Sequence, residues 1–150
     1  MSRASEPPVE LGTASPAGAG TPFEERFKLL SESGQANDQS IAAARFVLGM
    51  VEKRYDIQLT EQLGTSLVTH LAITLKRLLD GDTLIEAPDV VWQELQDYPE
   101  ELTFAASLVA ALEKVLNISI ARDETGFIAI HLCKIKRDLS EQFAGERNRA

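Results

Sequence analysis

Two histidines, His70 and His131, are the side chains whose type and position point most directly to chemistry. His70 lies three residues after Leu67, and His131 lies three residues after Ile128. At helical spacing, each imidazole falls at the edge of an apolar stripe. Such a histidine can be a core residue with its hydrogen bonds satisfied. It can also be a partly exposed ring that accepts a phosphoryl group, binds a metal or responds to pH.

Other motifs for chemistry are absent from the sequence. Cys133 is the only cysteine and follows His131 by two residues, which places the two on different faces of a helix. We therefore expect Cys133 to be a small buried hydrophobe. No glycine-rich phosphate loop, Gly-x-Ser-x-Gly turn or His-Glu-x-x-His pair occurs. We expect no cofactor and no metal; an enzyme or metal site would have to join the histidines to carboxylates such as Glu124 in space.

Charge and hydropathy narrow the classes of partner. The chain has 15 Lys and Arg against 23 Asp and Glu, with a formal net charge of −8. This balance disfavours direct nucleic-acid binding, which requires a clustered basic surface. No apolar run is long enough to cross a membrane, and the first residues lack the apolar core of a signal peptide. The single cysteine favours a reduced, cytoplasmic setting.

Helical periodicity dominates the chain after a Pro-, Gly- and Ala-rich start. Residues 1–21 are expected to be a disordered tail, and residues 22–150 a single helical domain. Pro22, Asn37, Thr60, Pro88 and Pro99 are start signals for helices. The expected helices span about 23–33, 39–55, 61–79, 88–96, 99–116 and 122–140.

These elements predict an all-α fold, a compact antiparallel bundle of about five main helices. The alternation at Ile118-Ser119-Ile120 is too short for a strand. No repeat of solenoid period is visible, although His70-Leu71 and His131-Leu132 form a small echo.

Three sequence blocks resemble the PTS regulation domain, or PRD, of bacterial antiterminators and activators. The blocks are LVTHLAITLKRLLDGDTL, DYPEE and ETGFIAIHLCK, and the last is the most specific. They occur in the family's order, and the two histidines are 61 residues apart, as in one such domain. The resemblance runs from Phe23 to about Leu139. Since only about 22 residues precede it, a stand-alone, single-domain member is expected.

The resemblance implies that His70 and His131 are phosphorylated by the phosphocarrier protein or an enzyme IIB of the sugar phosphotransferase system. It also implies a homodimer that controls transcription, here by docking to another regulator rather than to nucleic acid. We expect the histidines to lie close together on facing helices. Arg77, seven residues after His70, is a candidate phosphate or partner contact. Its alternative role is a solubilising surface charge.

Two features leave room for other interpretations. Many family members carry Asp directly before the first histidine, where this chain has Thr69. Glu124 and Asp138 lie seven residues either side of His131 and would oppose added negative charge. An interaction adaptor that is no longer phosphorylated therefore stays open as the main alternative, ahead of a metal or enzyme site.

Overall fold

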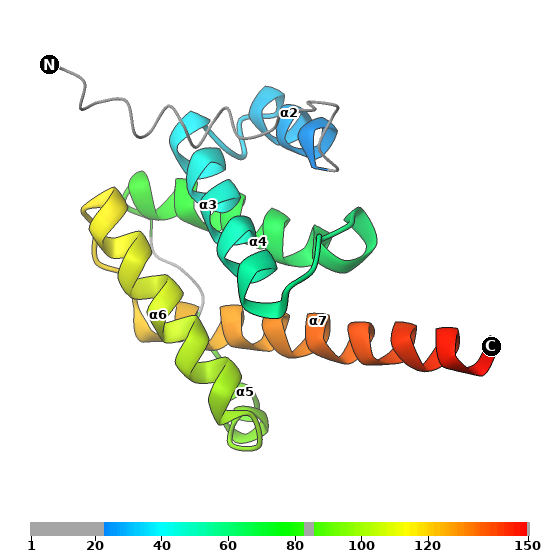
Figure 1. Cartoon of the computed structure of the whole chain (residues 1–150). Coiled ribbons are helices and arrows are strands. Elements are labelled where there is room, and N and C mark those ends of the chain that lie inside the picture. The colour runs from blue at the N-terminus through cyan, green and yellow to red at the C-terminus, as the bar shows by residue number, and fades with distance from the viewer. Residues whose placement is uncertain (1–22, 83–85, 150) are drawn as a thin grey trace, which may run out of the picture. The chain divides into compact units, whose positions relative to one another are not determined.

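The computed structural model describes residues 23–82 and 86–149; the tail expected at residues 1–21 lies outside the described residues. Within the described ranges the regular structure is entirely helical, which confirms the all-α prediction. The helices are α2 (Glu24–Glu32), α3 (Asp38–Tyr55), α4 (Glu61–Leu79), α5 (Asp89–Leu95), α6 (Pro99–Leu116) and α7 (Arg122–Arg149) (Figure 1). The described residues form two compact units, 23–82 and 86–149, and each unit is described by itself.

The first unit is built on the packing of α3 against α4, with α2 also contacting α4. Asn37 caps α3 by accepting a hydrogen bond from the Ser40 backbone N–H at 2.8 Å, while the Ser40 hydroxyl accepts from the Asn37 N–H. Thr60 caps α4 in the same way, accepting from the Leu63 N–H. These are the start signals expected from the sequence. The buried side chains of α3 and α4 follow the expected apolar stripes: Ile41, Ala44, Val47, Leu48, Val51, Leu63, Leu67, Leu71 and Leu75.

The second unit is built on α6 and α7, with α5 packed mainly against α7. Pro99 begins α6, as its fixed φ favours, and Glu100 and Glu101 lie in the first turn. The chain entering α5 is tied to the start of α7, because the Ala87 N–H donates to Asp123 Oδ2 at 3.0 Å. The short segment Ile118-Ser119-Ile120 is an extended connection and not a strand, as expected.

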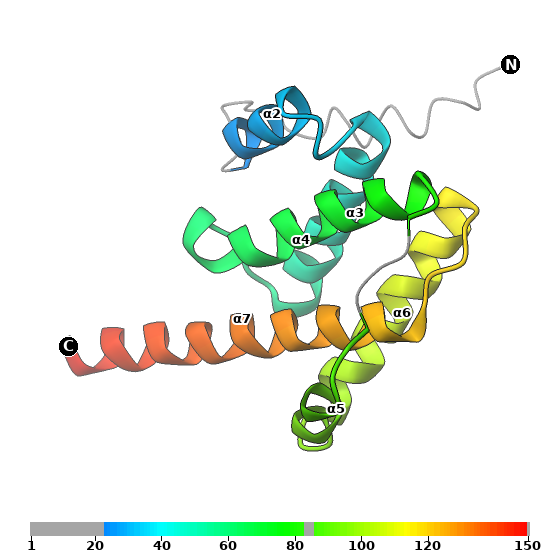
Figure 2. The ribbon, with the colours of Figure 1, turned by 180° about the vertical axis from the view of Figure 1, so that it is seen from behind.

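One helix boundary differs from the sequence expectation. The last helix was expected to end near residue 140, but α7 continues to Arg149 and is 28 residues long. Figure 2 shows it from behind as one uninterrupted helix. The apolar stripe fades after Leu139, whereas the residues beyond it are mostly good helix formers without a proline. Periodicity therefore marked the end of the buried face and not the end of the helix.

A large aromatic side chain lies against a glycine on the third helix of each unit. In the first unit a Cβ at Gly64 would lie 2.9 Å from Phe23 Cζ. In the second unit a Cβ at Gly126 would lie 3.0 Å from two ring carbons of Trp92. Glycine is thus required on α4 and α7 by close approach of a ring. Both glycines lie in the half of the helix that precedes the histidine.

Candidate functional site

The two candidate histidines occupy the same position along their helices. His70 is the tenth residue of α4, which begins at Glu61, and His131 is the tenth residue of α7, which begins at Arg122. Both residues are partly exposed. Each follows a completely buried alanine or valine by two residues, Val68 in α4 and Ala129 in α7. The backbone is therefore held on the core side while the imidazole remains within reach of solvent.

The residues next to His70 on α4 pack into the core of the first unit. Leu67 and Leu71, one turn before it and directly after it, are each only 1% exposed. Thr69 is partly buried, and its hydroxyl oxygen lacks a hydrogen-bond partner in the described part of the chain. The hydroxyl at this position is thus not committed to a structural hydrogen bond. It also does not reproduce the carboxylate that many relatives are expected to carry there.

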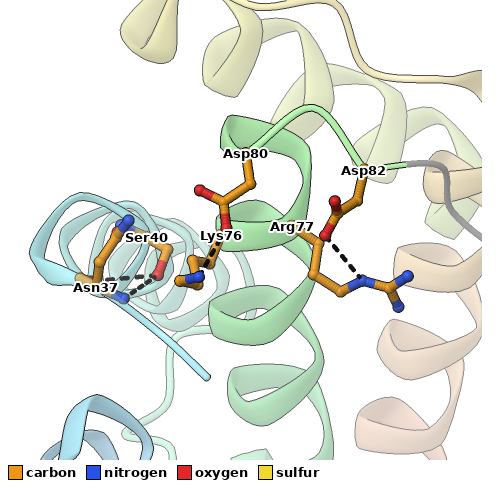
Figure 3. A network of polar contacts seen from close by, with 6 residues as sticks. All are labelled: Asn37, Ser40, Lys76, Arg77, Asp80 and Asp82. Carbon is orange, nitrogen blue, oxygen red and sulfur yellow. Dashed lines mark hydrogen bonds and ion pairs between the residues drawn. The ribbon is translucent and has the colours of Figure 1, made fainter. Parts of the chain in front are cut away.

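The C-terminal end of α4 carries two ion pairs, drawn in Figure 3. Lys76 Nζ lies 2.6 Å from Asp80 Oδ2, and Arg77 Nε lies 3.8 Å from Asp82 Oδ2. The Arg77 side chain is 45% exposed, so this longer pair contributes little to stability. Arg77 follows His70 by seven residues, about 10 Å along the helix axis at 1.5 Å per residue. It therefore lies on the same face of α4 as His70 without stacking on the imidazole.

His131 has a different electrostatic setting. Asp138 accepts a hydrogen bond from Lys134 Nζ at 2.9 Å, one helical turn away. This lysine balances a charge that the sequence alone suggested would oppose a phosphoryl group. Glu124 is buried, at 5% exposed, at the start of α7. Of the two carboxylates seven residues from His131, Asp138 is thus paired with a lysine and Glu124 is buried.

Cys133 is 4% exposed, in agreement with the buried hydrophobe expected from the sequence. Burial raises the pKa of its thiol to about 11, and the nearby charge of Glu101 adds to the shift. The thiolate is the nucleophilic form, so this cysteine is inert at neutral pH. Glu101 is itself 3% exposed and accepts a hydrogen bond from Lys136 Nζ at 3.1 Å.

Sequence reasoning missed the residues that hold the start of each histidine helix. The Glu52 carboxylate accepts from the Leu59 N–H, and the Glu113 carboxylate accepts from the Ile120 N–H, both at 2.7 Å. The available signal was a recurring Glu-Lys pair followed four residues later by Asp-Ile or Asn-Ile. The repeated His-Leu pair noted in the sequence analysis is the C-terminal end of this longer similarity between the two segments.

The proximity predicted for the two histidines stays a prediction, because they belong to different units. Within residues 23–82 and 86–149, no three His, Cys, Asp or Glu side chains are grouped so that they could hold a metal ion. Among the helices of these described residues, none is both long and apolar enough to span a bilayer.

Comparison with known proteins places these features in a family. Residues 46–134 match the PRD domain. Protein GlcT of Staphylococcus saprophyticus is 32% identical over 120 residues, which cover 78% of this chain and 40% of the relative. The GlcA/glcB genes antiterminator of Staphylococcus carnosus is 29% identical over 118 residues, covering 78% of this chain and 39% of the relative.

Protein GlcT of Staphylococcus aureus is 30% identical over 127 residues, which cover 79% of this chain and 44% of that protein. The chain thus spans about two fifths of the length of these curated relatives. No solved structure matches it. The matched segment contains both histidine blocks identified from the sequence, and the chain belongs to the PRD family.

Proposed function

We propose that this chain is a phosphohistidine-controlled regulatory module of the bacterial sugar phosphotransferase system that acts in transcriptional regulation. His70 and His131 are the proposed phosphoryl acceptors. The observation that carries the proposal is their equivalent placement: each is the partly exposed tenth residue of a helix, with buried residues two positions before it and directly after it. Membership of the PRD family and the antiterminator named among its relatives support the regulatory role.

The chemical step requires a neutral imidazole. A ring nitrogen lone pair attacks the phosphorus of a phosphorylated donor protein, a new N–P bond forms, and the bond between phosphorus and the donor's own side chain breaks. The proposed donors are the phosphocarrier protein or an enzyme IIB, which would place the module in the cytoplasm. The product carries a group of roughly −2 charge with three acceptor oxygens. Partial exposure of each ring supports access for the donor without local unfolding.

The phosphoryl group would act by changing the packing of helices or subunits. Charge added at the edge of an apolar stripe repels carboxylates and recruits donors, and Arg77 is the proposed donor on the His70 face. We propose a homodimer as the responding unit, since a two-fold pair is the commonest oligomer. Docking to another transcriptional regulator would carry the signal onward. Light scattering at tens of micromolar tests the dimer, and a monomer mass near 16.4 kDa would contradict it.

The decisive experiment is phosphoryl transfer followed site by site. The chain is incubated with phosphoenolpyruvate, enzyme I and the phosphocarrier, kept at neutral or basic pH, and digested for mass spectrometry. The wild type should carry phosphate on both histidines, His70→Ala only on His131, and His131→Ala only on His70. The double variant should carry none. Circular dichroism of each variant controls for loss of fold.

An interaction adaptor without phosphorylation is the second candidate, favoured by Thr69 at the position where many family members carry Asp. The same experiment separates the two functions. If the wild type takes up no phosphate from donors that phosphorylate a known acceptor in parallel, the adaptor function replaces the one proposed here. A Thr69→Asp variant that then becomes phosphorylated would identify the missing carboxylate as the cause.

A further inference from the structure

The two units share one local design between the end of a long helix and the histidine of the next. The segment from Glu52 to His70 and the segment from Glu113 to His131 have the same length, and each begins with Glu-Lys. In both, the long helix ends at a non-glycine residue in the left-handed conformation, Asp56 at φ 58° and Asn117 at φ 57°. In both, an isoleucine comes next and an aliphatic residue two positions later.

In the first unit, Glu52 holds this connection through two separate groups. Its backbone carbonyl accepts from the N–H of Asp56 and, at 3.1 Å, from that of Ile57, which closes the end of α3. Its carboxylate accepts from the Leu59 N–H at 2.7 Å. Leu59 is 2% exposed and lies two residues before α4 begins. One residue thus ties the end of α3 to the entry of α4.

Glu113 does the same in the second unit. Its carbonyl accepts from the N–H of Asn117 and, at 3.2 Å, from that of Ile118. Its carboxylate accepts from the Ile120 N–H at 2.7 Å. Ile120 is 9% exposed and lies two residues before α7 begins. The same contact therefore recurs in both units at the same distance and at the same position relative to the histidine.

We propose that Glu52 and Glu113 are positioning residues, each fixing the start of one histidine helix and thereby the presentation of one imidazole. Glu52 serves His70, and Glu113 serves His131. This inference rests on the proposed phosphorylation of these histidines. It adds residues that do not touch the phosphoryl group but decide where its acceptor lies.

The geometry of an α-helix explains why the entry point matters. A slip of one residue at the start of a helix rotates every side chain by about 100° and moves it about 1.5 Å along the axis. Each histidine follows its anchored aliphatic residue by eleven positions, within a helix that transmits such a shift unchanged. At the edge of an apolar stripe, that rotation carries an imidazole either into the core or away from it. Phosphoryl transfer is sensitive to displacements of this size.

The test uses the two histidines of one molecule as each other's control. The variants are Glu52→Ala, Glu52→Gln, Glu113→Ala and Glu113→Gln in the full chain, with Lys53→Ala and Lys114→Ala as exposed neighbours. Amide hydrogen exchange of Leu59 and Ile120 reports on the carboxylate contact. Phosphorylation rates at each histidine, and the imidazole NMR signals of each, report on positioning.

Glu52→Ala should lower the protection of the Leu59 amide and slow phosphorylation of His70 by about tenfold, leaving His131 unchanged. Glu113→Ala should lower the protection of the Ile120 amide and slow phosphorylation of His131 by the same factor, leaving His70 unchanged. Each Gln variant should keep most of the wild-type amide protection and phosphorylation rate, because its side-chain carbonyl still accepts from the same N–H. The two lysine variants should match the wild type in every measurement.

The outcomes separate this inference from the proposed function. Lost amide protection with unchanged rates and unchanged imidazole signals would overturn the positioning role. Equal slowing at both histidines would also overturn it, since that is what a general loss of stability produces. If the wild type takes up no phosphate, the proposed function fails, and the imidazole signals alone decide the positioning role. Where an Ala variant does not fold, the Glu→Asp variant, whose shorter chain withdraws the carboxylate, replaces it as the perturbation, and the Gln variant remains the control.

Discussion

Replacement of Gly126 by alanine tests the packing that places α7 against α5. A methyl group at this position would lie 3.0 Å from two ring carbons of Trp92 and 3.4 Å from a third. The Arg122 guanidinium carbon lies 3.8 Å from the centroid of the same ring, so a shift of the ring would also disturb this cation–π contact. In an open helix the substitution stabilises the protein by about 1 kcal/mol through helix propensity. Here overpacking should cost about 1–3 kcal/mol.

Gly49 supplies the matched control. It lies within α3, and a Cβ there would have nothing within 4 Å. Gly49→Ala should therefore realise the full gain in helix propensity, whereas Gly126→Ala should fall below it by about 1–3 kcal/mol. For a chain of this length, each kcal/mol corresponds to about 2–4 °C in the unfolding midpoint.

Urea unfolding followed by circular dichroism measures the free-energy difference between the two variants. Trp92 is the only tryptophan, so its fluorescence reports on this contact without further labelling. Its emission should shift to the red in Gly126→Ala and remain unchanged in Gly49→Ala. In a Trp92→Leu background, Gly126→Ala should regain the stability that overpacking removed. Equal stabilisation by both alanine variants, with unchanged emission, would refute the close packing of ring and glycine.

Three further predictions concern stability and reactivity. Cys133 should resist a thiol reagent at pH 8 in the native protein and react once in denaturant, and rapid native labelling would contradict its burial. Because the hydrogen bond to Glu101 raises the pKa of Lys136, the stability from this pair should be complete below about pH 10.5 and lost as the pH rises through the raised value. Alkaline unfolding curves measure this, and Lys136→Met should flatten the dependence; a parallel slope in the variant would count against the pair. Asn37→Ala should lower the free energy of unfolding by about 1 kcal/mol through loss of the α3 cap, measured against Gln39→Ala, which should change it little.

Much of the fold follows from local sequence signals, because the elements are helices with strong caps. Asn37 and Thr60 predict helix starts because each side chain caps a backbone N–H only three residues further along the chain. The end of α7 was misplaced, since its last turns have no apolar stripe to follow. The ring–glycine contacts were also beyond the sequence, because Phe23 and Gly64 are joined only after the chain has folded back on itself.

The candidate site shows the same division. The sequence alone identifies His70 and His131 as candidates by their type and spacing, and their partial exposure agrees with positions at the edge of an apolar stripe. The Lys134–Asp138 ion pair follows the i, i+4 spacing rule, so this part of the charge balance around His131 could also be predicted. The Glu52 and Glu113 contacts depend on a loop that turns a carboxylate back toward its own chain. No spacing rule predicts that from one sequence.

The left-handed residues that end α3 and α6 also shape which sequences this fold tolerates. Asp56 and Asn117 are both exposed, and surface positions usually accept most amino acids. At a φ near 58°, however, a β-branched side chain is strongly strained, and only Gly, Asn and Asp adopt the conformation readily. In a library of random single substitutions, these two solvent-facing positions should therefore be depleted as severely as many positions in the core. If mutational sensitivity alone were used to infer burial, Asp56 and Asn117 would be assigned to the core although both are exposed.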